Sequence, residues 1–512
     1  MVEENKCAIC SHKGKRSCPE LRGTICSVCC GEKRGSELSC PPRCSHFPFG
    51  TENYDGWLKI DGSWMQKAVH YIMEHVDRDR FKQVARRMDS EGGSSARNME
   101  IAFPATVYYL LGIDRDDEGK TLAERWEEEG WHGLDNDERV MMRYRRESFP
   151  TIIEVQKVLD VQSLECIDLL DPDKGPFVIF DRTFAQNAHH FSRFLLWLTH
   201  YPYFSRPGGG GLLVNYPIYH DFYNDLKKRA GKKRGKRIQL SQVKDYMAGH
   251  FGECCALIES LGKEYSNQLI RSLDANQCVA KYMIRSSWTE IKDIIKQKPD
   301  FQFDEKALKP DDPEGTRYYQ WLRRGESKKV ESSMHPTFRH YVERDGVGSL
   351  GTLKLCPDCL IVEILSRQKF EFAKGIMEKH FGSLVELVDE TIEDLSEGLE
   401  ERLSESQDLA AREDDGNDYY EQEKEEEDIP PEIQQKILER FYRKHYTNFL
   451  NDPIPALNGL TPRQASNDFE MRERLLDLMK GHLYHLSLNT REKGIKLDID
   501  WVLEELGLHE LL

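Results

Sequence analysis

Eight of the 14 cysteines in this 512-residue chain lie within its first 44 residues. Cys7 and Cys10 form one CxxC pair, Cys26 and Cys29 form a second, and 15 residues separate the two pairs. Each pair can bring two thiolates to one ion from a tight turn, and this spacing is typical of a tetrahedral structural zinc site. The sequence therefore predicts a zinc-binding module over residues 1–50. Four thiolate ligands leave no open coordination position, which favours a structural ion over a catalytic one.

The other cysteines of this cluster are enough for a second all-cysteine site, so we expect two zinc ions. Cys29 and Cys30 are adjacent, which favours ligands directed to different ions. The spacing leaves open which thiols share an ion, and His12 or His46 can replace one of them. A redox or iron–sulfur role is the alternative to zinc. The predicted ligands are Cys7, Cys10, Cys18, Cys26, Cys29, Cys30, Cys40 and Cys44.

The start of the chain, MVEENKCAIC, has no apolar signal region. The apolar run FLLWL at 194–198 is far shorter than the roughly 18 to 20 residues that a membrane-spanning helix needs. We therefore expect a cytoplasmic protein without a membrane partner. Thiols stay reduced in that compartment, which also favours metal binding by clustered cysteines.

The formal net charge of −17 is carried by one segment. Residues 386–428 contain 20 acidic and 3 basic residues, whereas the rest of the chain contains 69 of each. The composition of this segment cannot bury enough apolar surface to offset the entropy of ordering. We expect a solvated acidic linker over residues 400–429.

A basic segment lies nearer the middle of the chain, where eight of the 11 residues from 227 to 237 are Lys or Arg. Counterion release would let such a segment bind nucleic acid, and the nearby Tyr219 and Tyr223 are available to stack on bases. A solvated loop is the alternative interpretation. The candidate nucleic-acid contacts are Lys227, Lys228, Arg229, Lys232, Lys233, Arg234, Lys236 and Arg237.

The pattern of apolar residues predicts an α+β protein of several domains after the cysteine-rich module. Helical spacing marks a helical region over 51–140, and short β-branched and aromatic runs between turn residues predict a small β-barrel over 141–220. We expect a helical region with the basic loop over 221–345 and a hairpin followed by a helix over 346–399. A C-terminal helical interaction module is expected over 430–512.

The remaining motifs give little support for catalysis. The chain contains no GxSxG, HExxH or Walker loop. Cys356 and Cys359 form a single CxxC pair, which we interpret as a plain hairpin turn, because a metal site there would need other ligands such as His335 or His340. An enzyme with an active site in the central region stays open as an alternative.

Two strings resemble known families. HYTNFLNDPIPALNGLTPRQASNDFEMRERLLDLM, at 445–479, resembles the C-terminal segment of the MbcA/ParS/Xre antitoxin toxin-binding group. ICSVCCGEKRGSELSCPPRCSHF, at 25–47, is similar to the zinc region of uncharacterised bacterial multidomain proteins of SEC-C-associated type, although the chain lacks the terminal CxC cluster of SEC-C proteins.

These resemblances and the residue patterns together favour a bacterial binding or adaptor protein. A protein partner is expected through the C-terminal module at 430–512, and RNA or the ribosome through the basic segment at 227–237. The resemblance to the antitoxin group implies the alternative of a toxin–antitoxin-like or phage-defence regulator.

Overall fold

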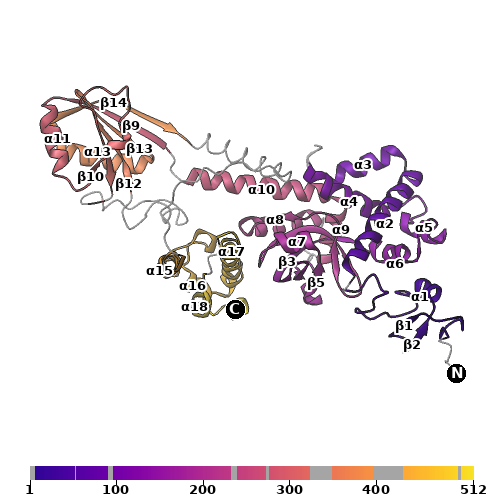
Figure 1. Ribbon diagram of the computed structural model, residues 1–512. Coiled ribbons are helices and arrows are strands. Elements are labelled where there is room, and N and C mark those ends of the chain that lie inside the picture. The colour runs from indigo at the N-terminus through magenta and orange to yellow at the C-terminus, as the bar shows by residue number, and fades with distance from the viewer. Residues whose placement is uncertain are drawn as a thin grey trace. The chain divides into compact units, whose positions relative to one another are not determined.

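The computed structural model of the protein consists of two compact units (Figure 1). Unit 1 comprises residues 1–262 and 420–512, and unit 2 comprises residues 263–419. The expected acidic linker and five of the basic residues, Lys232, Lys233, Arg234, Lys236 and Arg237, lie outside the described residues. The structure describes residues 6–51, 53–89, 96–231, 239–272, 276–322, 324, 349–395, 431–493 and 497–512.

Unit 1 begins with a small cysteine-rich head over residues 6–51. Strands β1 (Arg16–Cys18) and β2 (Gly23–Ile25) pair antiparallel, and helix α1 (Ser27–Lys33) follows directly. Both strands and the helix are very short, so regular secondary structure alone cannot give this head a substantial core.

Five helices follow the head, and side-chain caps fix where three of them begin. Asp77 accepts two backbone N–H groups at the start of α3, while Thr121 and Asp135 form capping boxes at the starts of α5 and α6. Trp64 of α2 is fully buried in a core that the helices share with the head and the barrel. The helices are α2 (Tyr54–His75), α3 (Arg78–Met88), α4 (Ala96–Gly112), α5 (Leu122–Glu128) and α6 (Asn136–Arg145).

A closed five-stranded barrel comes next and confirms the expected small β-barrel. Its strand order is β3-β4-β5-β7-β6, and a pairing of β3 with β6 closes it. The one parallel contact joins β5 and β7, and helix α7 lies between β5 and β6 in the chain; this is the Greek-key arrangement of OB-type barrels. The elements are β3 (Phe149–Asp160), β4 (Ser163–Asp168), β5 (Phe177–Phe180), α7 (Arg182–Asn187), β6 (Arg193–His200), β7 (Ser205–Pro207) and the short β8 (Leu212–Leu213), which pairs with β6.

The rest of unit 1 is helical, and its C-terminal helices form a core of their own around Leu475, Met479 and Val502. That core also takes in Phe191, which belongs to the barrel. The expected C-terminal module is therefore packed on the barrel and is not separate from it. The helices are α8 (Tyr216–Ala230), α9 (Leu240–Gly249), α10 (Phe251–Ser272), α15 (Pro431–Phe449), α16 (Pro462–Ser466), α17 (Phe469–Lys493) and α18 (Asp500–Glu505). Helix α10 begins in unit 1, and its residues 263–272 belong to unit 2.

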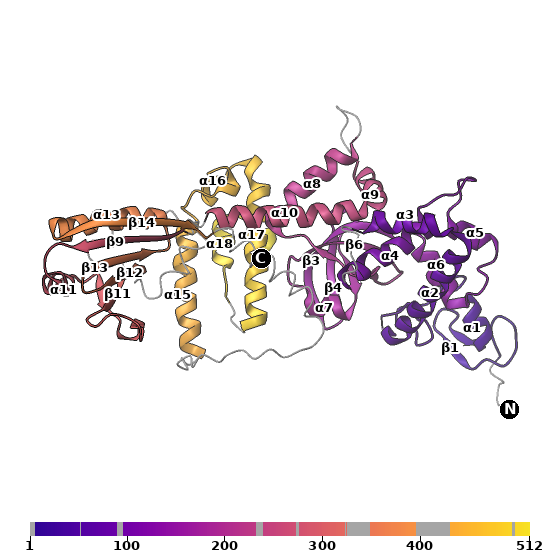
Figure 2. The ribbon, with the colours of Figure 1, turned by 90° about the horizontal axis from the view of Figure 1, so that it is seen from above.

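Unit 2 is built on a six-stranded antiparallel sheet with the order β10-β11-β12-β13-β9-β14 (Figure 2). Side chains of α11 and α13, including Ile291, Ile295, Phe370 and Met377, pack with one face of the sheet to form its core. The elements are β9 (Asn276–Ile284), α11 (Trp288–Lys296), β10 (Phe301–Phe303), β11 (Arg317–Leu322), β12 (Ser349–Leu355), β13 (Cys359–Ile364), α13 (Arg367–Phe381) and β14 (Val385–Asp394).

The structure confirms the expected α+β class with several folded parts, but it groups them differently. Strand β9 lies in a stretch where the sequence pattern favours helices, and β11 pairs with β12 across the expected boundary between 345 and 346. No helix among the described residues is long and apolar enough to cross a membrane.

Candidate metal centre and charged surfaces

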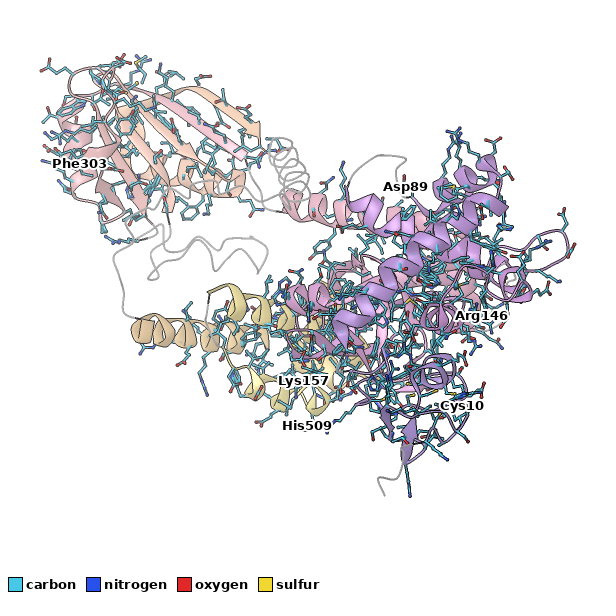
Figure 3. The ribbon with its side chains drawn as sticks, turned by 45° about the vertical axis from the view of Figure 1, so that its right-hand side comes forward. Cys10, Asp89, Arg146, Lys157, Phe303 and His509 are labelled. Atoms are coloured by element: carbon cyan, nitrogen blue, oxygen red, sulfur yellow. The ribbon has the colours of Figure 1, made fainter. Side chains whose placement is uncertain are left out.

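Four sulfur atoms converge in the head. The Sγ atoms of Cys7, Cys10, Cys26 and Cys29 all lie within 4.8 Å of one another, and those of Cys10 and Cys26 are 3.6 Å apart. Figure 3 labels Cys10 within the head. His12 does not replace a cysteine in this group, but its Nδ1 lies 3.3 Å from the Sγ of Cys10. The two CxxC pairs therefore meet in one group that can hold a metal ion, as their spacing predicts.

The local backbone prepares these thiols for a cation. Cys26 is the N-cap residue of α1, and its Sγ accepts the backbone N–H of Cys29 at 3.3 Å. Hydrogen bonds from the backbone N–H groups of Cys10 and Cys26 lower the pKa of the Cys7 thiol to about 6. The neighbouring Cys10 thiol and burial raise the pKa of Cys29. Thiolates crowded in this way repel one another unless a positive ion lies among them, and all-thiolate donors fit a soft divalent ion in a closed tetrahedral site.

The other four cysteines of the head line a single hollow. Cys18, Cys30, Cys40 and Cys44 all face it, together with His46. Burial raises the pKa of the Cys40 thiol to about 11, and the nearby thiols of Cys44, Cys30 and Cys18 add to the effect. Adjacent Cys29 and Cys30 thus face different groups of cysteines. Among the described residues, only the first four sulfur atoms converge within 4.8 Å.

The head is anchored to the helices and the barrel of unit 1. Arg34 forms a two-bonded ion pair with Asp137 of α6, in which its Nε donates to Oδ1 at 2.7 Å. The hydroxyl of Tyr203, in the loop between β6 and β7, donates to the carbonyl oxygen of Cys40 at 2.7 Å. Phe49 stacks on Tyr201 with 5.6 Å between the ring centroids. Cys40, one of the cysteines that line the hollow, is therefore hydrogen-bonded through its backbone to a barrel loop.

Only the first three predicted nucleic-acid contacts are described, and they form the end of α8. Lys227 lies 4.2 Å above the ring of Tyr223, and Arg229 is paired with Asp225. Lys228 is exposed. The Tyr219 ring, which the sequence offers for stacking on bases, is 9% exposed and is covered by the Arg193 guanidinium at 4.1 Å. Tyr219 is therefore unavailable to a base.

A second basic surface was missed by the sequence reasoning. Arg78, Lys82 and Arg86 follow one another at four-residue spacing along α3, so they lie on one face of the helix. All three side chains are exposed, and they form no ion pair with any residue that the structure describes. The sequence signal for this surface is the four-residue spacing of the three cations. Arg80, which lies between them and is paired with Asp114, makes this spacing hard to recognise.

A buried ion network joins the barrel to α17, and the sequence reasoning missed it as well. Glu154 of β3 and Arg193 of β6 are cross-strand partners, and the Arg193 Nε donates to Glu154 at 2.7 Å. Asp477 of α17 accepts two bonds from Arg193, at 2.5 and 3.1 Å, and Lys480 donates to Glu154 at 2.5 Å. His220 of α8 completes the group, with its Nε2 2.7 Å from Asp477. The one sign of this network in the sequence is Glu154, a glutamate within the apolar run of β3.

Cys356 and Cys359 lie at the turn between β12 and β13, where the N–H of Cys356 donates to the carbonyl oxygen of Cys359 at 2.8 Å. Both side chains are buried, and burial raises the pKa of Cys359 to about 12. The backbone of this pair therefore forms the hairpin turn between β12 and β13. His335 and His340 lie outside the described residues.

No protein-family model, curated protein or solved structure matches this chain. The resemblances to SEC-C-associated proteins and to the antitoxin toxin-binding group therefore stay predictions from the sequence. The chemistry of the site residues is the basis on which a function can be proposed.

Proposed function

We propose that this protein is a zinc-stabilised binding protein, in which the head holds two structural zinc ions and the remaining parts of the chain dock macromolecules. The convergence of four sulfur atoms in the head carries this proposal. Zinc suits the donor set because it is the common ion of closed four-thiolate structural sites. A site closed by four protein ligands leaves no position for substrate, which favours a structural role.

The second zinc is supported by the hollow that Cys18, Cys30, Cys40 and Cys44 line together. A bound ion would remove the electrostatic cost of bringing four thiolates together, and small sulfur movements would complete a tetrahedral site. His46 faces the same hollow and is an available fourth ligand if one thiol stays outside the coordination sphere.

The metal proposal is tested by elemental analysis of the full-length protein purified without chelator. We expect about two zinc ions per chain, and the loss of about one ion in each of two variants, Cys29→Ser and Cys40→Ser. Cys255→Ser, a buried thiol on α10, is the matched control and should keep both ions. Iron with visible absorption in place of zinc would contradict the proposal, and so would less than about one ion per chain.

Nucleic acid is the second candidate partner, and the unpaired basic row on α3 favours it. These exposed cations form no ion pair with a residue that the structure describes, so they can contact the phosphates of a nucleic acid, and binding would release the counterions of those phosphates. The segment at 227–237, where eight of 11 residues are Lys or Arg, is a second concentration of positive charge of the kind that nucleic-acid binding needs.

Binding of labelled single-stranded RNA at several salt concentrations tests this second candidate. Replacing Arg78, Lys82 and Arg86 with Ala should weaken binding. The slope of the logarithm of the binding constant against the logarithm of the salt concentration should become shallower by about three, one for each lost phosphate contact. Three exposed lysines of unit 2, Lys281, Lys296 and Lys309, are the matched control set and should leave the slope unchanged when replaced with Ala. Wild-type protein that fails to bind RNA at low salt would exclude this candidate.

A further inference from the structure

Strand β14 forms one edge of the sheet in unit 2. Over its whole length, Val385–Asp394, it pairs with β9 alone among the described strands. Val385 is buried, and the nine residues that follow it are exposed. Figure 1 shows β14 as a long strand at the margin of this sheet. A long exposed edge presents backbone N–H and C=O groups on which an additional strand can pair.

The side chains of β14 give its two faces different characters. Leu387 and Ile392 are cross-strand partners of Tyr282 and Cys278, which face the core of unit 2. They are nevertheless 44% and 38% exposed, because they lie beyond the part of the sheet that the core covers. Val388, 46% exposed, lies where the register shifts between β14 and β9. This face of the edge therefore carries two incompletely covered apolar side chains, beside Glu390 and Asp394, whose cross-strand partners Ala280 and Asn276 lie on the same face.

The opposite face of β14 is acidic. Asp389 and Glu393 are the cross-strand partners of Lys281 and Gln277 on the uncovered side of the sheet. Five of the ten residues in the strand are Asp or Glu, and none is basic. Glu386 and Glu390 are already paired with Arg285 and Lys374, whereas Asp389 and Glu393 form no ion pair with a residue that the structure describes.

This charge decides which strand can be added. Antiparallel pairing with a second copy of β14 would bring acidic side chains together across the new interface, and like charges opposite one another are destabilising. Acidic charge and a bulge are also common protection against edge-to-edge aggregation. The acidic charge repels acidic strands and further copies of this chain, but it attracts a strand that carries Lys or Arg.

We propose that β14 binds an extended basic peptide segment of a partner protein by strand addition. Backbone hydrogen bonds to the free edge would hold the segment, and its alternate residues would face opposite sides of the sheet. Lys or Arg residues of the bound segment would lie near Asp389 and Glu393 on one side of the sheet. Apolar residues of the segment would cover Leu387 and Ile392 on the other side. This site lies in unit 2 and does not depend on the metal centres of the head.

The test uses the full-length protein and a fluorescent ten-residue peptide of alternating Lys and Val, with binding followed by anisotropy. We expect saturable binding to the wild type and at least about a tenfold loss in the double variant Asp389→Lys/Glu393→Lys. The same variant should gain binding of the matching peptide of alternating Glu and Val, which a misfolded protein would not do. The control variant Glu305→Lys/Glu314→Lys makes the same change of charge at two other exposed residues of unit 2, and it should bind the Lys–Val peptide like the wild type.

A third peptide separates strand addition from simple charge attraction. N-methylation of alternate residues keeps the side chains and the charge but removes the backbone donors that pairing requires. We expect this peptide not to bind. Equal binding of the methylated and unmethylated peptides would overturn the proposal. It would also be overturned if the wild type dimerised and the double variant did not, because a second copy would then be the occupant of the edge.

Discussion

Phe191 is held in a backbone conformation that bulky residues rarely adopt. Its φ is 64°, in the left-handed region, which costs about 1–2 kcal/mol for a residue with a side chain. Its N–H donates to the carbonyl oxygen of Val155 at 2.7 Å, and its own carbonyl oxygen accepts the hydroxyl of Tyr216 at 2.7 Å. The ring is 3% exposed and belongs to the core of the C-terminal helices. Burial of this ring offsets the backbone strain and joins the barrel to those helices.

The buried carboxylate of Glu154 depends on two cationic partners, Arg193 and Lys480. It is fully buried, and although burial opposes its charge, Arg193 and Lys480 lower its pKa overall. Glu154→Gln would leave the buried Arg193 and the half-buried Lys480 with one remaining carboxylate, that of Asp477. We expect the free energy of unfolding of unit 1 to fall by about 3–5 kcal/mol, measured by urea unfolding.

A double-mutant cycle distinguishes loss of the pair from general damage to the barrel. Lys480→Met removes the second partner of Glu154, so the double variant Glu154→Gln/Lys480→Met should be more stable than the sum of the single losses implies. Glu165→Gln, a half-buried residue on the neighbouring strand β4, is the control and should change stability little. Strict additivity in the cycle would contradict coupling between the two residues.

Helix α17 shows how a single element serves two packing faces. Asp477 and Lys480 reach the barrel, whereas Leu475, Met479 and His482 face the core or aromatic side chains of the C-terminal helices. The two faces alternate along the helix at the three- and four-residue spacing that places side chains on common sides. The packing of α17 on the barrel and the folding of the C-terminal helices are therefore linked.

The burial of His482 makes the C-terminal helices sensitive to acid. Burial lowers its pKa to about 3, with added repulsion from His445 and His485, whereas an unfolded histidine has a pKa of about 6.5. The neutral form is thus favoured in the folded state. Its contribution to stability is complete above pH 6.5 and is lost progressively as the pH falls below 6.5 toward 3.

Thermal unfolding followed by circular dichroism between pH 7 and pH 4 measures this effect. We expect the wild type to lose up to about 1.4 kcal/mol per pH unit from this one group below pH 6.5. His482→Gln keeps a polar partner for the hydroxyl of Tyr446, 3.1 Å from His482 Nδ1, but cannot titrate. The variant should show a shallower pH dependence, and an unchanged slope would exclude His482 as the cause.

Local signals made several elements and one site predictable from the sequence. Thr461 followed by Pro462 is a typical sequence pattern for the start of a helix, and α16 begins there. The two CxxC pairs meet as their spacing predicts. Strand β9 was missed because its sequence, NQCVAKYMI, mixes polar and apolar residues and follows a long helix. Local patterns cannot identify a strand whose burial is decided by distant neighbours.

The buried ion network could not be predicted either, because its partners are far apart in the sequence. Arg193 and Asp477 are 284 residues apart in the chain, and Glu154 and Lys480 are 326 apart. Charge patterns within a short window carry no information about pairs so distant. The same limit applies to the anchoring of the head, because Arg34 and Asp137 are separated by 103 residues.

The anchoring of the head leads to a prediction for unit 1 as a whole. The free energy of metal binding contributes to the folding free energy of a small thiolate site, and that contribution is lost when a chelator removes the ion. Because Arg34 and Tyr203 tie the head to α6 and to the barrel loop, metal removal should also loosen those contacts. We expect hydrogen exchange after chelation to rise in the head, in α6 and in the loop between β6 and β7. Unit 2 serves as the internal control, and its strands β9 and β13 should exchange at unchanged rates. Faster exchange confined to residues 6–51 would show instead that the head folds independently of the surface on which it is packed.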